Sequence, residues 1–252
     1  MQQDALATLL GRVVRLADAP NVRSVVLLGS LARGKGGPWS DIDLERWVAN
    51  EDESGDAFPR YVDGRLLMIN TVSVGHVRAE LRSARKAIWA VPAYRAMRVL
   101  IDRFGDAAAI RQAVEGFEWR SVAEDAQRFV RLTAAKCAEY VHKIRAGTNE
   151  RDEFSALHAA RALSSKCLEA VAVARGTFIS TENEYFGVVS EAAGPSWTLA
   201  FRASLGLGGT HDAFAQAAAA CRLYAETARL VADELDDETN SIVATALALV
   251  AG

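Results

Sequence analysis

The sequence has little of what marks a disulfide-stabilised or metal-rich protein. It contains three cysteines, Cys137, Cys167 and Cys221, whose wide spacing forms neither a metal-binding motif nor an even disulfide set. We therefore predict three reduced thiols in the cores of helical segments. The four histidines form no close-spaced metal set either, and these are His76, His142, His158 and His211.

Long apolar runs and an excess of basic residues are also missing. Residues 1–18 mix acids with apolar side chains at helical spacing, which favours an amphipathic helix over a signal peptide. Residues 241–252 are apolar but too short to cross a bilayer. The formal net charge of −3 lacks the basic excess of a nucleic-acid binder. We expect a cytoplasmic protein with neither a membrane nor a nucleic acid as its partner.

Apolar residues make up 50% of the 252 residues and charged residues 24%, which is typical of a well-packed core. A chain of this length forms one large domain or two ordinary ones. Strand-like patterns stop near Gly116, and helical periodicity continues from there. We predict an α+β protein, with a mixed sheet and helices over residues 1–116 and an all-α helical bundle over residues 117–252.

Within the first part, the pattern predicts a helix ending at Pro20, followed by strands over residues 23–28 and 41–48. The acidic stretch 49–58 is expected to be a solvated loop. Asp63-Gly64 predicts a hairpin turn into a third strand, and residues 87–104 form an apolar segment broken at Pro92. Helices are expected over residues 74–83, 122–146, 150–175, 182–193, 196–204, 211–234 and 238–249.

The stretch from residue 25 to residue 44, VVLLGSLARGKGGPWSDIDL, carries the clearest chemical signal. Gly29 allows the chain to leave the apolar strand sharply, and Ser30 offers a hydroxyl and a backbone N–H to a phosphate. Arg33, in the following loop, can neutralise phosphate charge. The pattern therefore predicts a phosphate-binding turn.

Asp41 and Asp43 follow this loop two residues apart, so on a strand both side chains point to one face. Paired carboxylates suit Mg²⁺, which prefers oxygen ligands and completes its shell with water and substrate phosphates. A metal held beside a phosphate-binding turn indicates nucleotidyl transfer by in-line displacement at the α-phosphorus. A D-x-D pair alone is weak evidence, whereas strand, G-S, loop and D-x-D together are far more specific.

These residues resemble the fingerprint of the polymerase-β nucleotidyltransferase superfamily, which is G-S, a spacer and D-x-[DE]. The loop is most similar to that of the kanamycin nucleotidyltransferase family, the aminoglycoside 4′-adenylyltransferases. The resemblance implies transfer of AMP from ATP, with Mg²⁺, to a hydroxyl of an aminoglycoside. It implies metal and catalytic roles for Asp41 and Asp43, and it assigns nucleotide contacts to Gly29, Ser30, Arg33 and Ser40. For residues 87–104 it implies a turn followed by a helix.

Glu139 and Lys143 stand four residues apart on the first long helix, so they lie on one face. By themselves they form an ordinary surface ion pair. The kanamycin family has an E-Y-x-x-K run at the comparable place, and this resemblance implies that Glu139 is the general base and Lys143 a phosphate ligand. It also implies a homodimer whose two subunits share each active site.

One departure from the family pattern concerns a third carboxylate, which the resemblance places near residues 68–70. This sequence has Met68, Ile69 and Asn70 there, and Glu45 or Asp63 are possible substitutes. Two alternatives therefore stay open beside the aminoglycoside enzyme. One is a protein that binds nucleotide or aminosugar without turnover, and the other is an enzyme acting on a lincosamide or another hydroxylated metabolite.

Overall fold

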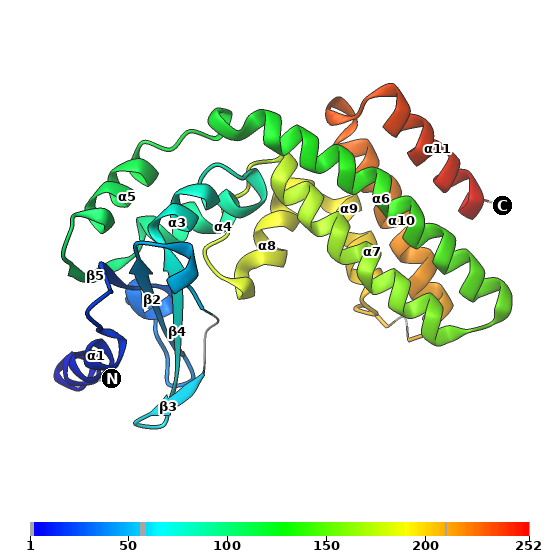
Figure 1. The fold of residues 1–252 in the computed structure, drawn as a ribbon. Coiled ribbons are helices and arrows are strands. Elements are labelled where there is room, and N and C mark those ends of the chain that lie inside the picture. Colours follow the sequence, from blue (N-terminus) through cyan, green and yellow to red (C-terminus); the bar gives the residue numbers. More distant parts are fainter. Residues whose placement is uncertain (1–2, 56–58, 210, 252) are drawn as a thin grey trace. The chain divides into compact units, whose positions relative to one another are not determined.

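The computed structural model describes residues 3–55, 59–209 and 211–251 (Figure 1). The chain divides into two compact units, residues 1–121 and residues 122–252. The boundary expected at Gly116 lies directly after the helix Asp106–Glu115, five residues before this division. Residues 56–58 of the expected acidic loop 49–58 lie outside the described residues. The predicted α+β class is confirmed, because a mixed sheet with helices precedes a helical unit.

Unit 1 contains a five-stranded sheet with the order β3-β4-β2-β1-β5, in which only β2 and β4 pair in parallel. Its strands are β1 (Ser24–Leu27), β2 (Ile42–Val48), β3 (Arg60–Val62), β4 (Arg65–Ser73) and β5 (Arg98–Asp102). Its helices are α1 (Gln3–Ala17), α2 (Gly29–Ala32), η1 (Glu51–Glu53), α3 (Val74–Glu80), α4 (Ala84–Arg95) and α5 (Asp106–Glu115). The short helix η2 (Trp119–Val122) follows α5.

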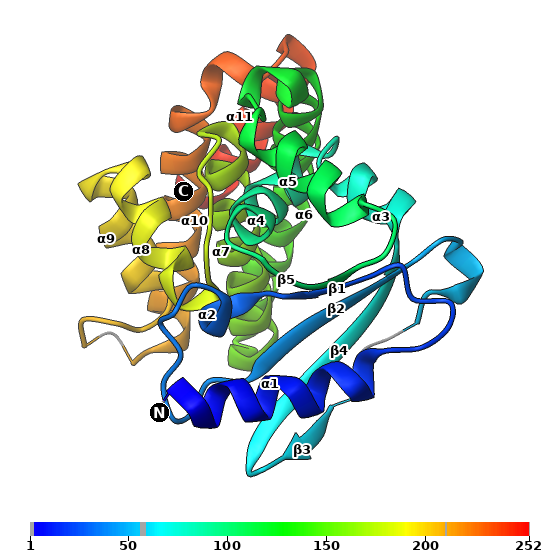
Figure 2. The ribbon, with the colours of Figure 1, turned by 90° about the vertical axis from the view of Figure 1, so that its left-hand side faces the viewer.

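Alternation along β2 sends its side chains to two different environments. Ile42 and Leu44 are buried in a core that includes Val13 of α1, which lies across this face of the sheet (Figure 2). Asp43 and Glu45 therefore point to the opposite face, and both are half-buried. Because of this alternation, Asp43 and Glu45 lie on the same face of β2, opposite to the face that packs against α1.

Helix α4 covers part of that opposite face. Trp47 of β2 and Tyr94 of α4 are fully buried there, with their rings edge to face and their centroids 5.8 Å apart. Asp43 lies four residues before Trp47 and is only half-buried. On this face of β2, the side chain of Trp47 is therefore shielded from solvent, whereas that of Asp43 is partly exposed.

The helix implied after Pro92 is wrong. Pro92 lies inside α4, near its end, where its missing N–H removes one of the last hydrogen bonds of the helix. The chain then enters β5, which pairs antiparallel with β1 and carries the β-branched residues Val99 and Ile101. Strand β2 also begins at Ile42, so Asp41 precedes the strand on which it was expected.

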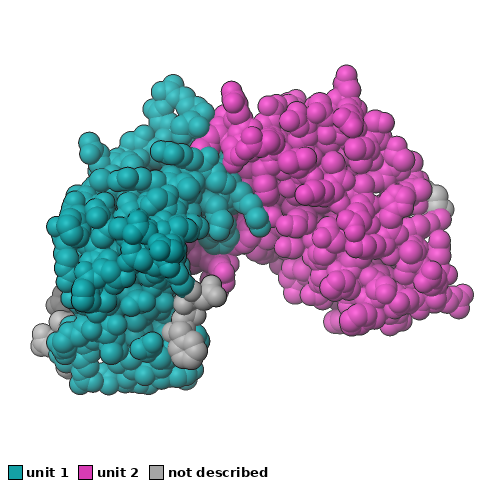
Figure 3. All heavy atoms as spheres, viewed as in Figure 1, with its two compact units in different colours: residues 1–121 teal, residues 122–252 magenta. Residues whose placement is uncertain are grey.

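In the described part of unit 2, which Figure 3 colours magenta, the regular elements are all helices. Its elements are α6 (Ala123–Glu150), α7 (Glu153–Ala174), α8 (Glu182–Ala193), α9 (Pro195–Ser204), α10 (Ala213–Leu230), η3 (Ala232–Glu234) and α11 (Asp237–Ala251). Cys137, Cys167 and Cys221 are free and buried, which confirms the prediction of core thiols. None of the described helices combines the length and the apolar character that a membrane crossing requires.

Candidate active site

The turn after β1 packs directly on a carboxylate of β2. Gly29 has a positive φ of 67°, and the N–H of Leu28 donates to the carbonyl oxygen of Asp43 at 2.8 Å. A Cβ atom added to Gly29 would lie 2.1 Å from Oδ2 of Asp43. Only glycine satisfies both the backbone conformation and this contact. The predicted G-S turn and the second acid of the D-x-D pair are therefore in contact.

Asp43 carries an unusual charge balance. The pKa of its carboxyl is raised to about 6, because burial and then the negative charge of Asp41 raise it more than the positive charge of Arg33 lowers it. The charges of Asp41 and Arg33 therefore both act on the carboxylate of Asp43. A cation bound beside Asp43 would favour the ionised form of its carboxyl.

The donor set fits a hard divalent cation with few protein ligands. Among the described residues no group of three or more histidine, cysteine or acidic side chains is placed to hold a metal ion. Mg²⁺ is commonly held by one or two carboxylates, with water and substrate phosphates as its remaining ligands. Asp41 and Asp43 match this arrangement, and the half-buried Arg33, whose charge acts on Asp43, can offset the charge of a phosphate.

The loop between α2 and β2 is fastened by a residue that sequence analysis missed. Arg65, at the start of β4, donates to the carbonyl oxygens of Gly37 and Ser40 at 3.0 and 3.1 Å. The hydroxyl of Ser40 accepts from the N–H of Gly37 at 2.9 Å. The basic residue after the Asp63-Gly64 turn was the available signal. Arg65 thus positions the chain just before Asp41.

The parallel register of β2 and β4 settles which side chains are neighbours of the acids. Met68 is the partner of Asp43, and Asn70 is the partner of Glu45. An apolar side chain therefore occupies the position beside Asp43 where a further carboxylate was considered. Asp63 forms an ion pair with Arg12 of α1 at 2.7 Å, so its carboxylate is held at the hairpin turn.

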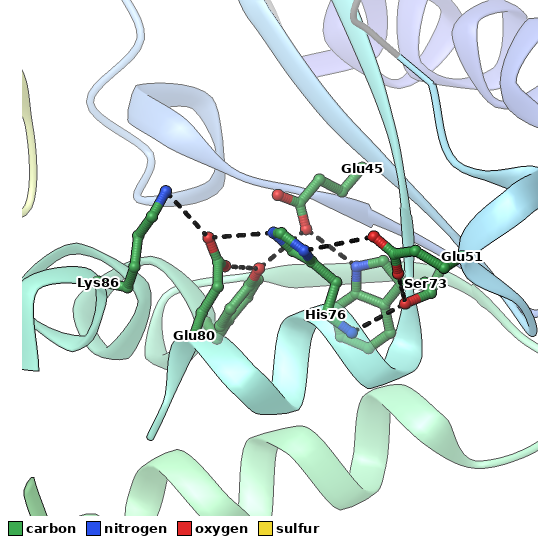
Figure 4. Close-up of polar contacts among 8 residues, drawn as sticks. Glu45, Glu51, Ser73, His76, Glu80 and Lys86 are labelled. Atoms are coloured by element: carbon green, nitrogen blue, oxygen red, sulfur yellow. Dashed lines mark hydrogen bonds and ion pairs between the residues drawn. The ribbon is translucent and has the colours of Figure 1, made fainter. Parts of the chain in front are cut away.

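Glu45 enters a polar network under α4 (Figure 4). Its Oε2 accepts from Nε1 of Trp47 at 2.9 Å and from the hydroxyl of Tyr94 at 3.2 Å. The same hydroxyl lies 3.1 Å from Oε2 of Glu80. The pKa of Glu45 is raised to about 7, because burial, together with the charge of Glu80, outweighs the hydrogen bonds from Trp47 and Tyr94 that lower it.

The network continues outward to the surface of α3. His76 lies 3.7 Å from Glu80 and 3.7 Å from Glu51, and Lys86 lies 3.9 Å from Glu80. The hydroxyl of Ser73 donates to Glu51 and accepts from the N–H of His76, which caps α3. These contacts connect residues of β4, η1, α3 and α4 with one another.

Glu139 and Lys143 lie on α6 in unit 2, whereas the turn and the D-x-D pair belong to unit 1. Their side chains form an exposed ion pair of 2.6 Å, and Nζ of Lys143 lies 5.5 Å from the ring centroid of Tyr140. The hydrogen bond from Lys143 lowers the pKa of Glu139 and raises that of Lys143. In the described structure the two residues are partners of each other.

Comparison with known proteins first places the site in a broad class. A family model described as a nucleotidyltransferase domain matches residues 6–45, a segment that includes β1, α2 and Asp43. A search of curated proteins finds no match to this chain.

A solved structure then extends the likeness to the whole fold. A nucleotidyltransferase-like protein from Exiguobacterium sibiricum aligns with a TM-score of 0.52, covering 90% of this chain and 78% of that chain. Its sequence identity is 9%, so the two proteins share a fold. The finer resemblance to the kanamycin family stays a prediction.

Proposed function

We propose that this protein is a Mg²⁺-dependent nucleotidyltransferase that transfers a nucleoside monophosphate, AMP from ATP, to a hydroxyl of a small polar acceptor. The observation that carries the proposal is the contact of the Gly29 turn with Asp43, beside Asp41 and Arg33. The nucleotidyltransferase-domain match over residues 6–45 supports it, because this segment contains the same residues.

The residues of unit 1 have separate tasks in this reaction. Asp41 and Asp43 hold the Mg²⁺, which, when bound, offsets the charge of the triphosphate and of the attacking oxygen. Ser30 and Arg33 bind phosphate oxygens, and Ser40 holds the loop that leads into Asp41. The acceptor oxygen bonds to the α-phosphorus, the bond from that phosphorus to the bridging oxygen breaks, and pyrophosphate leaves.

The proton of the acceptor hydroxyl needs a base, and Glu139 is the proposed one. Its pKa is lowered while Lys143 donates to it, which makes it a weak base in the free protein. When Lys143 binds a phosphate instead, Glu139 loses that hydrogen bond and becomes more basic. We propose a homodimer in which Glu139 of the partner subunit and Lys143 of the partner subunit complete each site.

The acceptor is proposed to be an aminoglycoside, on the basis of the resemblance to the kanamycin family. A lincosamide or another hydroxylated metabolite is the alternative within the enzyme class. A second candidate function is favoured by Met68, which stands beside Asp43 in place of a further carboxylate. This candidate binds nucleotide or aminosugar without transferring the nucleotide.

The deciding experiment incubates the protein with ATP labelled at the α-phosphate, Mg²⁺ and separate aminoglycoside or lincosamide acceptors. Labelled acceptor, identified by mass, is the expected product. Asp41→Asn and Asp43→Asn are expected to abolish it, while Asp52→Asn, which changes an exposed acid of η1, leaves it unchanged. Nucleotide binding without any labelled product would favour the binding protein instead.

A further inference from the structure

Unit 2 contains a cavity that the proposed transfer reaction does not use. Its volume is about 530 Å³, and α6, α10 and α11 line it. Helices α6 and α10 both pack on α7, and α11 packs on α6 (Figure 1). The volume falls within the roughly 300–1,000 Å³ of small-molecule sites.

The inner wall of this cavity is apolar. Ile144 of α6, Phe214 of α10 and Leu247 of α11 supply large side chains, and the small residue Ala218 leaves space between them. Cys221 lies in the same wall, where burial raises the pKa of its thiol to about 11 and keeps it neutral at physiological pH. Cys221 therefore adds no negative charge to the lining of the cavity.

Two arginines make the rest of the lining basic. Arg145 of α6 and Arg222 of α10 both line the cavity and are exposed. Neither guanidinium has an ion-pair or hydrogen-bond partner among the described residues. By contrast, Lys143 and Arg229, on the same two helices, are paired with acids one helical turn away. An apolar wall beside two uncompensated guanidinium groups is complementary to a molecule with an anionic head and an apolar body.

We propose that this cavity binds a medium-chain carboxylate, with its chain against Ile144, Phe214 and Leu247 and its carboxylate between Arg145 and Arg222. Guanidinium groups bind carboxylates through charge-assisted and often bidentate hydrogen bonds. The alkyl chain gains free energy by leaving water for the apolar wall. All the lining residues of this cavity belong to unit 2, whereas Asp41 and Asp43 belong to unit 1.

The test is a calorimetric titration of the full chain with decanoate, below its micelle concentration and at pH 7.5. One site per chain is expected. Decylamine has a similar chain and a positive head, and it should bind at least about tenfold more weakly, since the arginines then repel the ligand. The double variant Arg145→Gln/Arg222→Gln should weaken decanoate binding by at least about tenfold, whereas Arg161→Gln, an exposed arginine of α7, should leave it unchanged.

A second variant tests the cavity itself. Ala218 is exposed, so Ala218→Trp fills the cavity without disturbing the core, and it should abolish decanoate binding while circular dichroism stays unchanged. The proposal is overturned if the folded wild-type protein shows no saturable decanoate binding, or if decylamine binds equally well. It is also overturned if Ala218→Trp instead dissociates a dimer, because a second copy then occupies the cavity. Sedimentation with anionic vesicles in the absence of decanoate binding would overturn it too, because it identifies a membrane surface.

Discussion

Gly29 has no room for a side chain, because a Cβ atom would lie 2.1 Å from Oδ2 of Asp43. Gly29→Ala must therefore push the carboxylate away, in addition to placing alanine at a φ of 67°. We expect Mg²⁺-dependent transfer to fall by about a hundredfold, the scale of the loss from a misplacement of about 1 Å in a reacting group. Steady-state kinetics with labelled ATP measure this loss.

Gly34 provides the matched control for this variant. Its φ is 72°, close to that of Gly29, but a Cβ atom added to it has no other atom within 4 Å. Gly34→Ala therefore adds a backbone strain of about 1–2 kcal/mol without a contact to a carboxylate. If both variants lose activity equally, the strain alone explains the effect and the contact with Asp43 has no role.

Glu45 predicts a pH dependence of stability. Its pKa is raised from an ordinary value of 4.5 to about 7, so the folded state binds more protons than the unfolded state between these values. The free energy of unfolding must then fall as the pH rises from about 4.5 to about 7. Glu45→Gln removes the part of this fall that Glu45 causes and gains on the order of 2 kcal/mol at pH 8, as measured by urea unfolding across this range.

Glu53 is the control for the sign of this effect. Hydrogen bonds from Asn21 and Asn50 lower its pKa, so it contributes no loss of stability with rising pH. Glu53→Gln should therefore keep the wild-type fall between pH 4.5 and 7. Asp43, whose pKa is raised to about 6, should supply the part of the fall that Glu45→Gln leaves. A flat wild-type profile would contradict the burial argument.

At the scale of elements, Arg65 joins the start of β4 to the loop that precedes β2. Arg65→Gln loses the charged donor to the carbonyl oxygens of Gly37 and Ser40 and frees the chain before Asp41. We expect a several-fold rise in KM for the nucleotide with little change in thermal stability, because the site loses its preorganisation while the core is untouched. Arg60→Gln, which changes an exposed residue of β3, should leave KM unchanged. A lower kcat at constant KM would contradict this role.

Local sequence patterns predicted some of the strands and missed others. The apolar pattern placed the first two strands at residues 23–28 and 41–48, and β1 and β2 lie within these ranges because each strand is marked by its own consecutive residues. The strand β5 was missed because it has five residues and its partner β1 is distant in sequence. Arg65 was missed because its acceptors are backbone carbonyl oxygens of a distant loop, and its place after the Asp63-Gly64 turn does not indicate which groups it contacts.

The register between two elements is likewise beyond local patterns. Whether residue 68 or residue 70 stands beside Asp43 depends on how β2 and β4 align, and hydrophobic alternation alone allows both. The structure places Met68 there. Local patterns could not predict the network of Glu45 with Tyr94 and Glu80 either, because this network forms only when α4 packs over β2.

At the scale of the whole molecule, the residues of the proposed mechanism are divided between two compact units. Asp43 belongs to unit 1 and Glu139 to unit 2. If a homodimer shares its sites, the inactive variants Asp43→Asn and Glu139→Gln must complement each other, because a mixed dimer contains one site with both residues intact. Equal amounts, denatured together and refolded, should recover about a quarter of wild-type activity, since half of the dimers are mixed and each has one working site.

The same experiment separates the alternatives for Glu139. If Glu139 acted within its own chain, every site in a mixed dimer would lack either Asp43 or Glu139, and no activity would return. If Glu139 were only the ion-pair partner of Lys143, Glu139→Gln alone would keep its activity, because an exposed pair contributes little. Mixing Asp43→Asn with Asp41→Asn provides the control, because both losses fall in unit 1 and no arrangement of the two chains restores a complete metal site.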